Sequence, residues 1–139
     1  MSGGVLRDGE LALAISTAVV RELAGTTGRG PMRAKTTLGD NAVFVVLQDT
    51  LTRGERNLVD AGESDAVLSL RRLWQKVMRT SCSQAIEDLT GRKVVGFMSD
   101  NHIDPDIAVE VGGGAQPARV RQQHVSVGIA GQRHLRRLL

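Results

Sequence analysis

The spacing of apolar residues changes along the chain, and each change marks a different kind of element. Over residues 10–23 an apolar residue recurs every four positions, which predicts one face of an α-helix. Over residues 32–38 apolar and polar residues alternate as in a β-strand, and residues 39–41 form a turn sequence. Residues 43–47 are all apolar, so we expect this second strand to lie inside the sheet. A helix is therefore predicted to precede a β-hairpin.

A capping box predicts where the next helix begins. Thr52 and Glu55 stand in the pattern Ser/Thr-x-x-Glu, which opens a short helix that Gly62 interrupts. Ser64 is placed to cap a longer helix that runs to Gly91. The apolar face of this longer helix is predicted to carry Val67, Leu70, Trp74, Val77, Met78, Ile86 and Leu89.

Two further strands complete the regular part of the chain. They are predicted over residues 93–98 and 107–111, joined by a polar link over residues 99–106 that Pro105 should keep irregular or at a sheet edge. The three glycines at 112–114 are expected to end the pattern. The order helix, hairpin, two helices, hairpin predicts an α+β fold of two layers, with a mainly antiparallel four-stranded sheet and helices on one face.

Composition divides the chain into three parts. We expect a flexible N-terminus over residues 1–9, a single α+β domain over residues 10–112, and a mobile Gly- and Arg-rich tail over residues 113–139. Residues 1–112 hold 13 Lys and Arg against 15 Asp and Glu, whereas the tail has five arginines and no acid. These arginines are Arg119, Arg121, Arg133, Arg136 and Arg137. The main body is thus mildly acidic, which argues against specific nucleic-acid binding, and the tail is expected to make weak, salt-sensitive contacts at most.

The small number of aromatic residues and the single cysteine argue against a single-strand nucleic-acid binder and against a disulfide-bonded secreted protein. The aromatic residues are Trp74, Phe44 and Phe97, so the core must be aliphatic and few rings are left for stacking bases. Cys82 is the only cysteine, which excludes an intrachain disulfide and fits a reducing compartment. No apolar run approaches the roughly 20 residues of a membrane-spanning helix, and the N-terminus lacks a signal-peptide pattern. We therefore expect a cytoplasmic protein that does not insert into a membrane.

Three segments resemble a known family when taken together. They are Gly28-Arg29-Gly30-Pro31 with Arg33-Ala34-Lys35, then Asp49-Thr50-Leu51-Thr52-Arg53-Gly54-Glu55, then Ser99-Asp100-Asn101-His102-Ile103-Asp104-Pro105-Asp106. In this order and spacing they are similar to the bacterial MpsC-like family, formerly a domain of unknown function. That family is described as the C component of a sodium-translocating, membrane-potential-generating system. The resemblance covers about residues 8–112. It implies a cytosolic accessory role beside a membrane cation-transport system, and it supplies no catalytic residues.

The glycine-containing loop over residues 25–31 suggests an anion site. Glycines let backbone N–H groups approach an anion, and nearby basic side chains could add charge. The candidate residues are Gly28, Arg29, Gly30, Arg33 and Lys35. The loop follows a helix, however, whereas phosphate-binding fingerprints follow a strand and open a helix. The alternative is a helix-to-strand connection with a solvated basic face.

Alternating acidic residues and a histidine suggest a divalent-ion site. Asp100, His102, Asp104 and Asp106 would project to one side of an extended segment, and their oxygen and nitrogen atoms are suitable ligands. The segment lacks the glycine and the distal glutamate of a calcium loop. The alternative is a polar hairpin connection in which Asp and Asn cap backbone N–H groups and Pro105 sets the turn.

Evidence for catalysis is weak in this sequence. It contains no Gly-x-Ser-x-Gly motif, and Cys82 lies in mid-helix without a neighbouring histidine or basic pair to activate it, so we name no catalytic residues.

The leading hypothesis is a non-enzymatic accessory protein that acts through protein contacts and needs no cofactor. The alternatives are an anion- or nucleotide-binding sensor that uses the loop over residues 25–31, and a metal-dependent enzyme at residues 100–106. A one-sided helical layer leaves a sheet face or edge to cover, which favours a homodimer.

Overall fold

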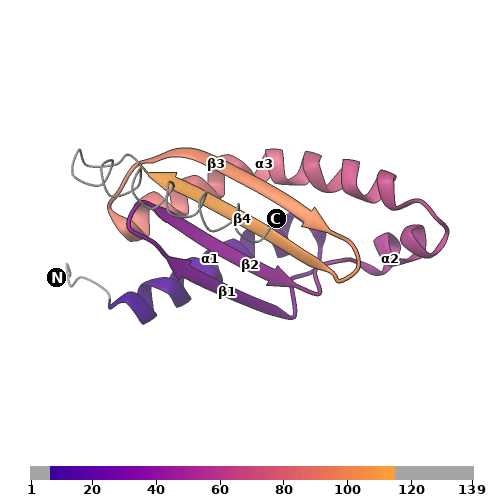
Figure 1. Ribbon diagram of the computed structural model, residues 1–139, viewed down its shortest axis with the longest axis horizontal. Helices are drawn as coiled ribbons and strands as arrows, with labels where there is room; N and C mark the ends of the chain where they lie inside the picture. The colour runs from indigo at the N-terminus through magenta and orange to yellow at the C-terminus, as the bar shows by residue number, and fades with distance from the viewer. Residues whose placement is uncertain (1–6, 115–139) are drawn as a thin grey trace, which may run out of the picture.

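The computed structural model describes residues 7–114, which form three helices and four strands (Figure 1). The elements are α1 (Asp8–Thr27), β1 (Arg33–Leu38), β2 (Ala42–Gln48), α2 (Arg53–Asp60), α3 (Ser64–Thr90), β3 (Val94–His102) and β4 (Ile107–Gly114). The five arginines of the predicted tail and the first six residues lie outside the described residues.

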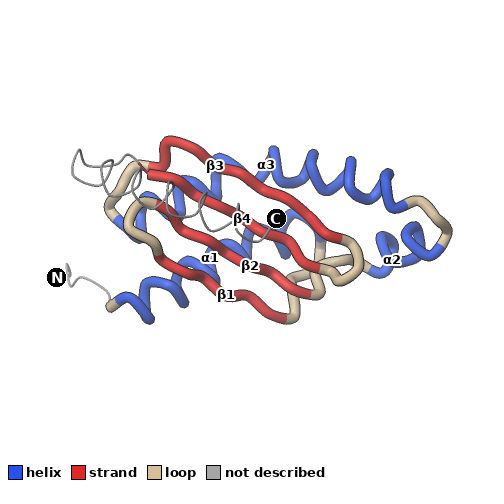
Figure 2. Tube along the Cα trace, viewed as in Figure 1, coloured by secondary structure: helices blue, strands red, loops and turns tan. Residues whose placement is uncertain are grey.

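The four strands form one antiparallel sheet in the order β1-β2-β4-β3. Figure 2 shows the strands side by side, with α1 and α3 behind them on one face. The fold class predicted from the sequence is confirmed. Strand β2 lies between β1 and β4, as its wholly apolar sequence predicts, and pairs along both edges, although its outward residues Phe44 and Val46 are exposed.

The hydrophobic core lies between the helices and the inner face of the sheet. It contains Ile15, Val19 and Leu23 from α1, Val43, Val45 and Leu47 from β2, Met78, Cys82 and Ile86 from α3, and Ala108 from β4. The four-residue stripe of the first helix therefore does face the core. The predicted aliphatic core is confirmed, and no aromatic side chain belongs to its buried set.

Several boundaries differ from those that the sequence predicts. Helix α1 continues past Gly25 to Thr27 and is capped by Gly28, which has a φ of +83° and whose amide donates to the Ala24 carbonyl. Strand β3 continues to His102, so residues 99–102 belong to the sheet and not to an irregular link. The three glycines at 112–114 form the end of β4. Pairing between the strands satisfies the backbone of these polar and glycine residues, and that gain outweighs their weak strand propensity.

Helix α3 buries the predicted face only in part: Val67, Met78 and Ile86 are buried, and Leu70, Trp74 and Leu89 are partly buried. Val77 is 71% exposed, whereas Arg71 and Gln75 are buried. The buried positions are 67, 71, 75, 78, 82 and 86. Ser64 is not the cap either, since the N-cap is Glu63 and makes no side-chain cap bond. Apolar spacing alone could not place Arg71 and Gln75 on this face because both are polar.

Candidate functional site at the meeting point of three segments

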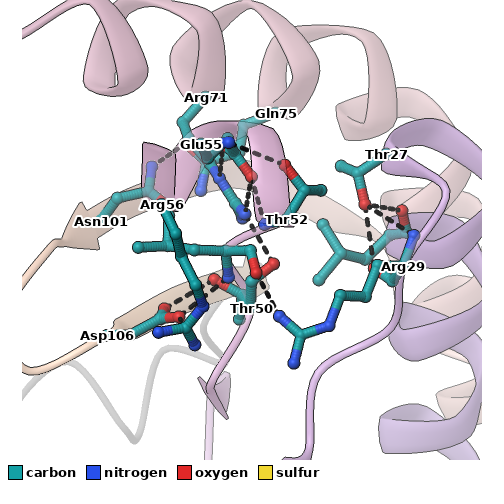
Figure 3. A network of polar contacts seen from close by, with 12 residues as sticks. Thr27, Arg29, Thr50, Thr52, Glu55, Arg56, Arg71, Gln75, Asn101 and Asp106 are labelled. Atoms are coloured by element: carbon teal, nitrogen blue, oxygen red, sulfur yellow. Dashed lines mark hydrogen bonds and ion pairs between the residues drawn. The ribbon is translucent and has the colours of Figure 1, made fainter. Parts of the chain in front are cut away.

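The three segments singled out in the sequence meet at one end of the sheet. Arg29 comes from the loop after α1, the stretch 49–56 follows β2 and opens α2, and Asp106 lies just before β4 (Figure 3). Arg71 of α3 reaches the same place. We call this group the motif cluster, and it comprises Arg29, Thr50, Leu51, Thr52, Glu55, Arg56, Arg71 and Asp106.

Asp106 ties the β3–β4 turn to the chain that leaves β2. Its Oδ1 accepts a hydrogen bond from Thr50 Oγ1 at 2.9 Å, and its Oδ2 accepts one from the Leu51 amide at 2.8 Å. Its backbone carbonyl accepts from the Asp49 amide at 3.1 Å. Arg56 Nη2 lies 3.6 Å from Oδ2 and supplies the opposite charge. The carboxylate therefore acts as an anchor that joins two distant parts of the chain.

Asp49 lets the chain turn toward this anchor. Its φ of +57° is in the left-handed region, which aspartate tolerates better than most side chains. The turn follows the last residue of β2 directly and presents Thr50 and Leu51 to Asp106.

Glu55 and Arg71 form a buried ion pair under α2. Arg71 Nε and Nη2 each lie 2.6 Å from a carboxylate oxygen of Glu55, a two-pronged arrangement, and Nη2 also donates to the Thr50 carbonyl at 2.7 Å. Both side chains are only 2% exposed. Glu55 Oε1 accepts from the Thr52 amide at 2.8 Å while Thr52 Oγ1 accepts from the Glu55 amide, so the predicted capping box is confirmed. The helix cap and the ion pair thus share one carboxylate.

Arg29 joins the first helix to the same stretch. Its Nη1 donates to the Leu51 carbonyl. Thr27 Oγ1 accepts from the Arg29 amide, and the carbonyls of Leu23 and Arg29, each 2.9 Å away, share its single proton, which fixes the loop that carries the guanidinium (Figure 3). Among the described residues, every buried side-chain nitrogen and oxygen has a hydrogen-bond partner. The arrangement holds three loops in a fixed relation.

A second polar chain runs from the motif end of the sheet into the core. Asn101 Nδ2 donates to Gln75 Oε1 at 2.8 Å, and Gln75 Nε2 donates to Glu110 Oε1 at 3.2 Å. Ser99 Oγ donates to the other oxygen of Glu110. Burial raises the pKa of Glu110 to about 7, although the bonds from Ser99 and Gln75 lower it in part. Near neutral pH the protonated and the ionised form of the Glu110 carboxyl group are therefore both populated.

A family model that matches the chain describes an ion-transport system. It is the model for the Na+-translocating membrane potential-generating system (MpsC), and it matches residues 7–112. The chain belongs to the MpsC family. No curated protein and no solved structure matches the chain significantly. Within residues 7–114, none of the MpsC helices combines the length and apolar character that crossing a membrane requires.

In this MpsC chain the five residues of the predicted anion site are divided. Arg29 contacts Leu51, whereas Arg33 and Lys35 project from the exposed side of β1. The amide of Gly28 donates to Ala24 and that of Arg29 to Thr27, so these two donors of the supposed cradle are already bonded. A Cβ atom placed on Gly30 would lie 3.6 Å from Val20 Cγ1, which is an ordinary van der Waals distance. The anion site stays a prediction from sequence.

The residues of the predicted metal site are also distributed over different surroundings. Asp100 Oδ1 accepts from the Asn101 amide, and His102 Nδ1 lies 2.8 Å from the Pro105 carbonyl. Asp104 is exposed in the turn, and Asp106 belongs to the motif cluster. Within residues 7–114, no three His, Cys, Asp or Glu side chains are grouped so that they could hold a metal ion. The metal site also stays a prediction from sequence.

The structure brings in residues that the sequence did not mark as a site. Arg71, Gln75 and Glu110 lie on a helix and a strand, and their local patterns carry no motif. The available signal was indirect: a Glu at the third position of a capping box needs a partner when that helix end is buried. Cys82 is buried, and burial together with the nearby Glu110 raises its thiol pKa to about 12. It is a core residue.

Replacing Asp106 by alanine is expected to loosen this end of the MpsC domain. The change removes the acceptor for Thr50 and for the Leu51 amide, and we expect the free energy of unfolding to fall by about 2 kcal/mol. Urea denaturation measures this loss, and hydrogen exchange should speed up at the Leu51 amide. Asp104→Ala, in the same turn but exposed, is the matched control and should change stability by less than about 0.5 kcal/mol. Equal effects of the two changes would contradict the anchoring role.

Proposed function

We propose that this chain is a non-enzymatic accessory component of a Na+-translocating, membrane-potential-generating system. It acts in the cytoplasm, as a homodimer, through contacts with the other protein components. The observation that carries the proposal is the family match, which spans residues 7–112 and therefore the whole α+β domain.

The hydrogen bonds and ion pairs within the motif cluster support a role in binding a protein partner. Its charged groups are bonded within the cluster: Glu55 binds Arg71, and Asp106 binds Arg56, the Thr50 hydroxyl and the Leu51 amide. These bonds give the three loops one fixed shape, which suits a surface that a partner recognises, since a preformed surface loses little conformational entropy on binding.

Exposed apolar side chains supply area for such contacts. They occur on both sides of the domain, and the most exposed are Leu13, Met32, Leu73, Val77, Val95 and Met98. Apolar area that is removed from water on association is the main source of binding free energy between proteins. The helical layer and the outer sheet face can therefore serve different partners.

Sedimentation with membrane vesicles tests the proposal. Vesicles are prepared with and without the membrane-embedded components of the same system, and the tagged full chain is added to both. We expect the chain to sediment only with vesicles that contain the components. A chain that stays in the supernatant with both kinds of vesicle contradicts the proposal.

A charge variant separates protein contact from attraction to lipid. Replacing the five tail arginines by glutamine leaves residues 1–112 unchanged and removes the basic excess of the tail. We expect this variant to bind the component vesicles within about twofold of the natural chain, because tail charges contribute only weak, screened attraction. Sedimentation of the natural chain with component-free vesicles, lost in the variant, would show that lipid charge and not a protein partner retains the chain.

A further inference from the structure

The outer face of the sheet is apolar in its middle, and within residues 7–114 no helix packs on it. Phe44 and Val46 of β2 and Met98 of β3 are exposed, at 44%, 38% and 64%. Val109 and Val111 of β4 lie between them and are partly exposed. The helices α1 and α3 occupy the opposite face (Figure 2). This outer face is defined here by the outward residues of all four strands.

Strand register arranges these side chains in rows across the sheet. In one row Thr37 pairs with Phe44, Phe44 with Val111, and Val111 with Met98. The adjacent row runs Lys35, Val46, Val109, Asp100 in the same way. It begins with a positive charge on β1, is apolar in the middle and ends with a negative charge on β3. Both end residues are exposed.

A row of this kind is complementary to itself after one particular rotation. If two sheets pack face to face about a two-fold axis parallel to the strands, β1 of one copy lies over β3 of the other. Lys35 then faces the second copy's Asp100, and Val46 faces Val109. An axis perpendicular to the strands would place Lys35 over Lys35. Opposite charges at both edges of the row therefore select the first axis.

We propose that the outer face of the sheet binds the same face of a second copy of this chain, about a two-fold axis parallel to the strands. The inference specifies the homodimer of the proposed function, but it requires no transport role. The two sheets form a sandwich whose strands cross at about 30°, so the central valines meet most closely and the long Lys35 side chain spans the wider gap at the edge. The row of Arg33, Gln48, Ile107 and His102 adds no carboxylate to the contact.

The size of the face sets the expected affinity. Four strands about 4.8 Å apart and about seven residues long at about 3.3 Å per residue make a face of about 19 Å by 23 Å. Two such faces bury on the order of 1,000 Å², near the lower limit for a specific interface. We therefore expect dissociation constants on the order of micromolar, and the dimer must be measured over a range of concentrations.

Sedimentation velocity of the full-length chain, from about 1 to 200 µM, tests the inference across the expected dissociation constant. The natural chain should pass from monomer to dimer. Phe44→Asp should weaken association at least about a hundredfold, because it places two carboxylates in the apolar centre of a symmetric interface. Val77→Asp is the matched control: it introduces the same charge at an exposed apolar position on α3 and should leave the dimer unchanged.

A charge exchange tests the orientation. Lys35→Glu alone and Asp100→Lys alone should each weaken the dimer about tenfold, since each change places like charges together twice in a two-fold interface. The double variant should restore affinity to within about threefold of the natural chain, because the pairs are re-formed with their signs reversed. The two residues are exposed, so all three variants should remain folded, as circular dichroism will verify.

Three outcomes overturn the inference: a natural chain that is monomeric throughout, a dimer that Phe44→Asp leaves intact, and a double variant no better than the single ones. The first would mean that something else covers the face, such as residues 115–139 or another component. These measurements use the purified chain without membranes, so a dimer found here would stand even if the transport role failed. Equally, a failure of the dimer would leave the transport role untouched.

Discussion

Replacing Arg71 by methionine is expected to lower the free energy of unfolding by about 3–5 kcal/mol. Methionine fills much of the volume of the arginine stem, so the loss arises from the charge and the hydrogen bonds. Glu55 is 2% exposed and would lose the guanidinium that balances its charge, keeping only the bond from the Thr52 amide. The Thr50 carbonyl would also lose its donor. Urea denaturation at pH 7 measures the effect.

A double variant shows whether the unpaired charge is the cause. Glu55→Gln keeps an oxygen that can accept from the Thr52 amide, so the capping box can survive while the charge is removed. We expect Arg71→Met with Glu55→Gln to regain at least half of the stability that Arg71→Met loses, because breaking a buried pair costs more than removing it. Arg71→Lys should lie between the natural chain and Arg71→Met, since one ammonium group cannot reproduce the two-pronged contact. A single variant that loses less than about 1 kcal/mol would contradict a desolvated ion pair.

The fold could be predicted because its main signals are local. The four-residue stripe of α1, the alternation in β1 and the capping box of α2 each follow from side chains that are close in sequence. Strand order was not accessible in this way. The central pair β2–β4 joins segments about 65 positions apart, and only the tertiary fold determines which apolar strands meet.

The site was predicted only in part, for a related reason. The three segments of the family resemblance were found, and the structure joins them through Arg29, Leu51 and Asp106. Asp106, which the sequence offered as a metal ligand or as a cap in a polar connection, accepts bonds from the Leu51 amide and the Thr50 hydroxyl in this structure. Arg71 and Gln75 were missed, since a polar residue on a buried helix face looks like a surface residue when only the sequence is considered.

Glu110 is the second site at which a large effect is expected, and its environment explains why. The side chain projects from β4 into the core beside Cys82, is 3% exposed, and receives bonds from Ser99 and Gln75. Burial disfavours the charged form and raises the pKa from 4.5 to about 7. In the unfolded chain the carboxyl is solvated and returns to its ordinary pKa. Cys82 does not titrate in this range, because its pKa is raised to about 12.

The consequence is a stability that falls as the pH rises. Between pH 4.5 and 7 the folded state holds the proton of Glu110 more often than the unfolded state does, so raising the pH favours unfolding. The stabilisation is complete below about pH 4.5 and is lost as the pH passes through about 7, which amounts to about 3 kcal/mol at most.

Glu110→Gln removes the ionisation and keeps groups that can bond to Ser99 and Gln75. We therefore expect the variant to match the natural chain in stability at pH 5 and to exceed it by about 2–3 kcal/mol at pH 8. Urea denaturation of both proteins over this range gives the difference curve, in which groups common to the two chains cancel. A difference that stays constant from pH 5 to pH 8 would mean that Glu110 ionises alike in the folded and unfolded chains.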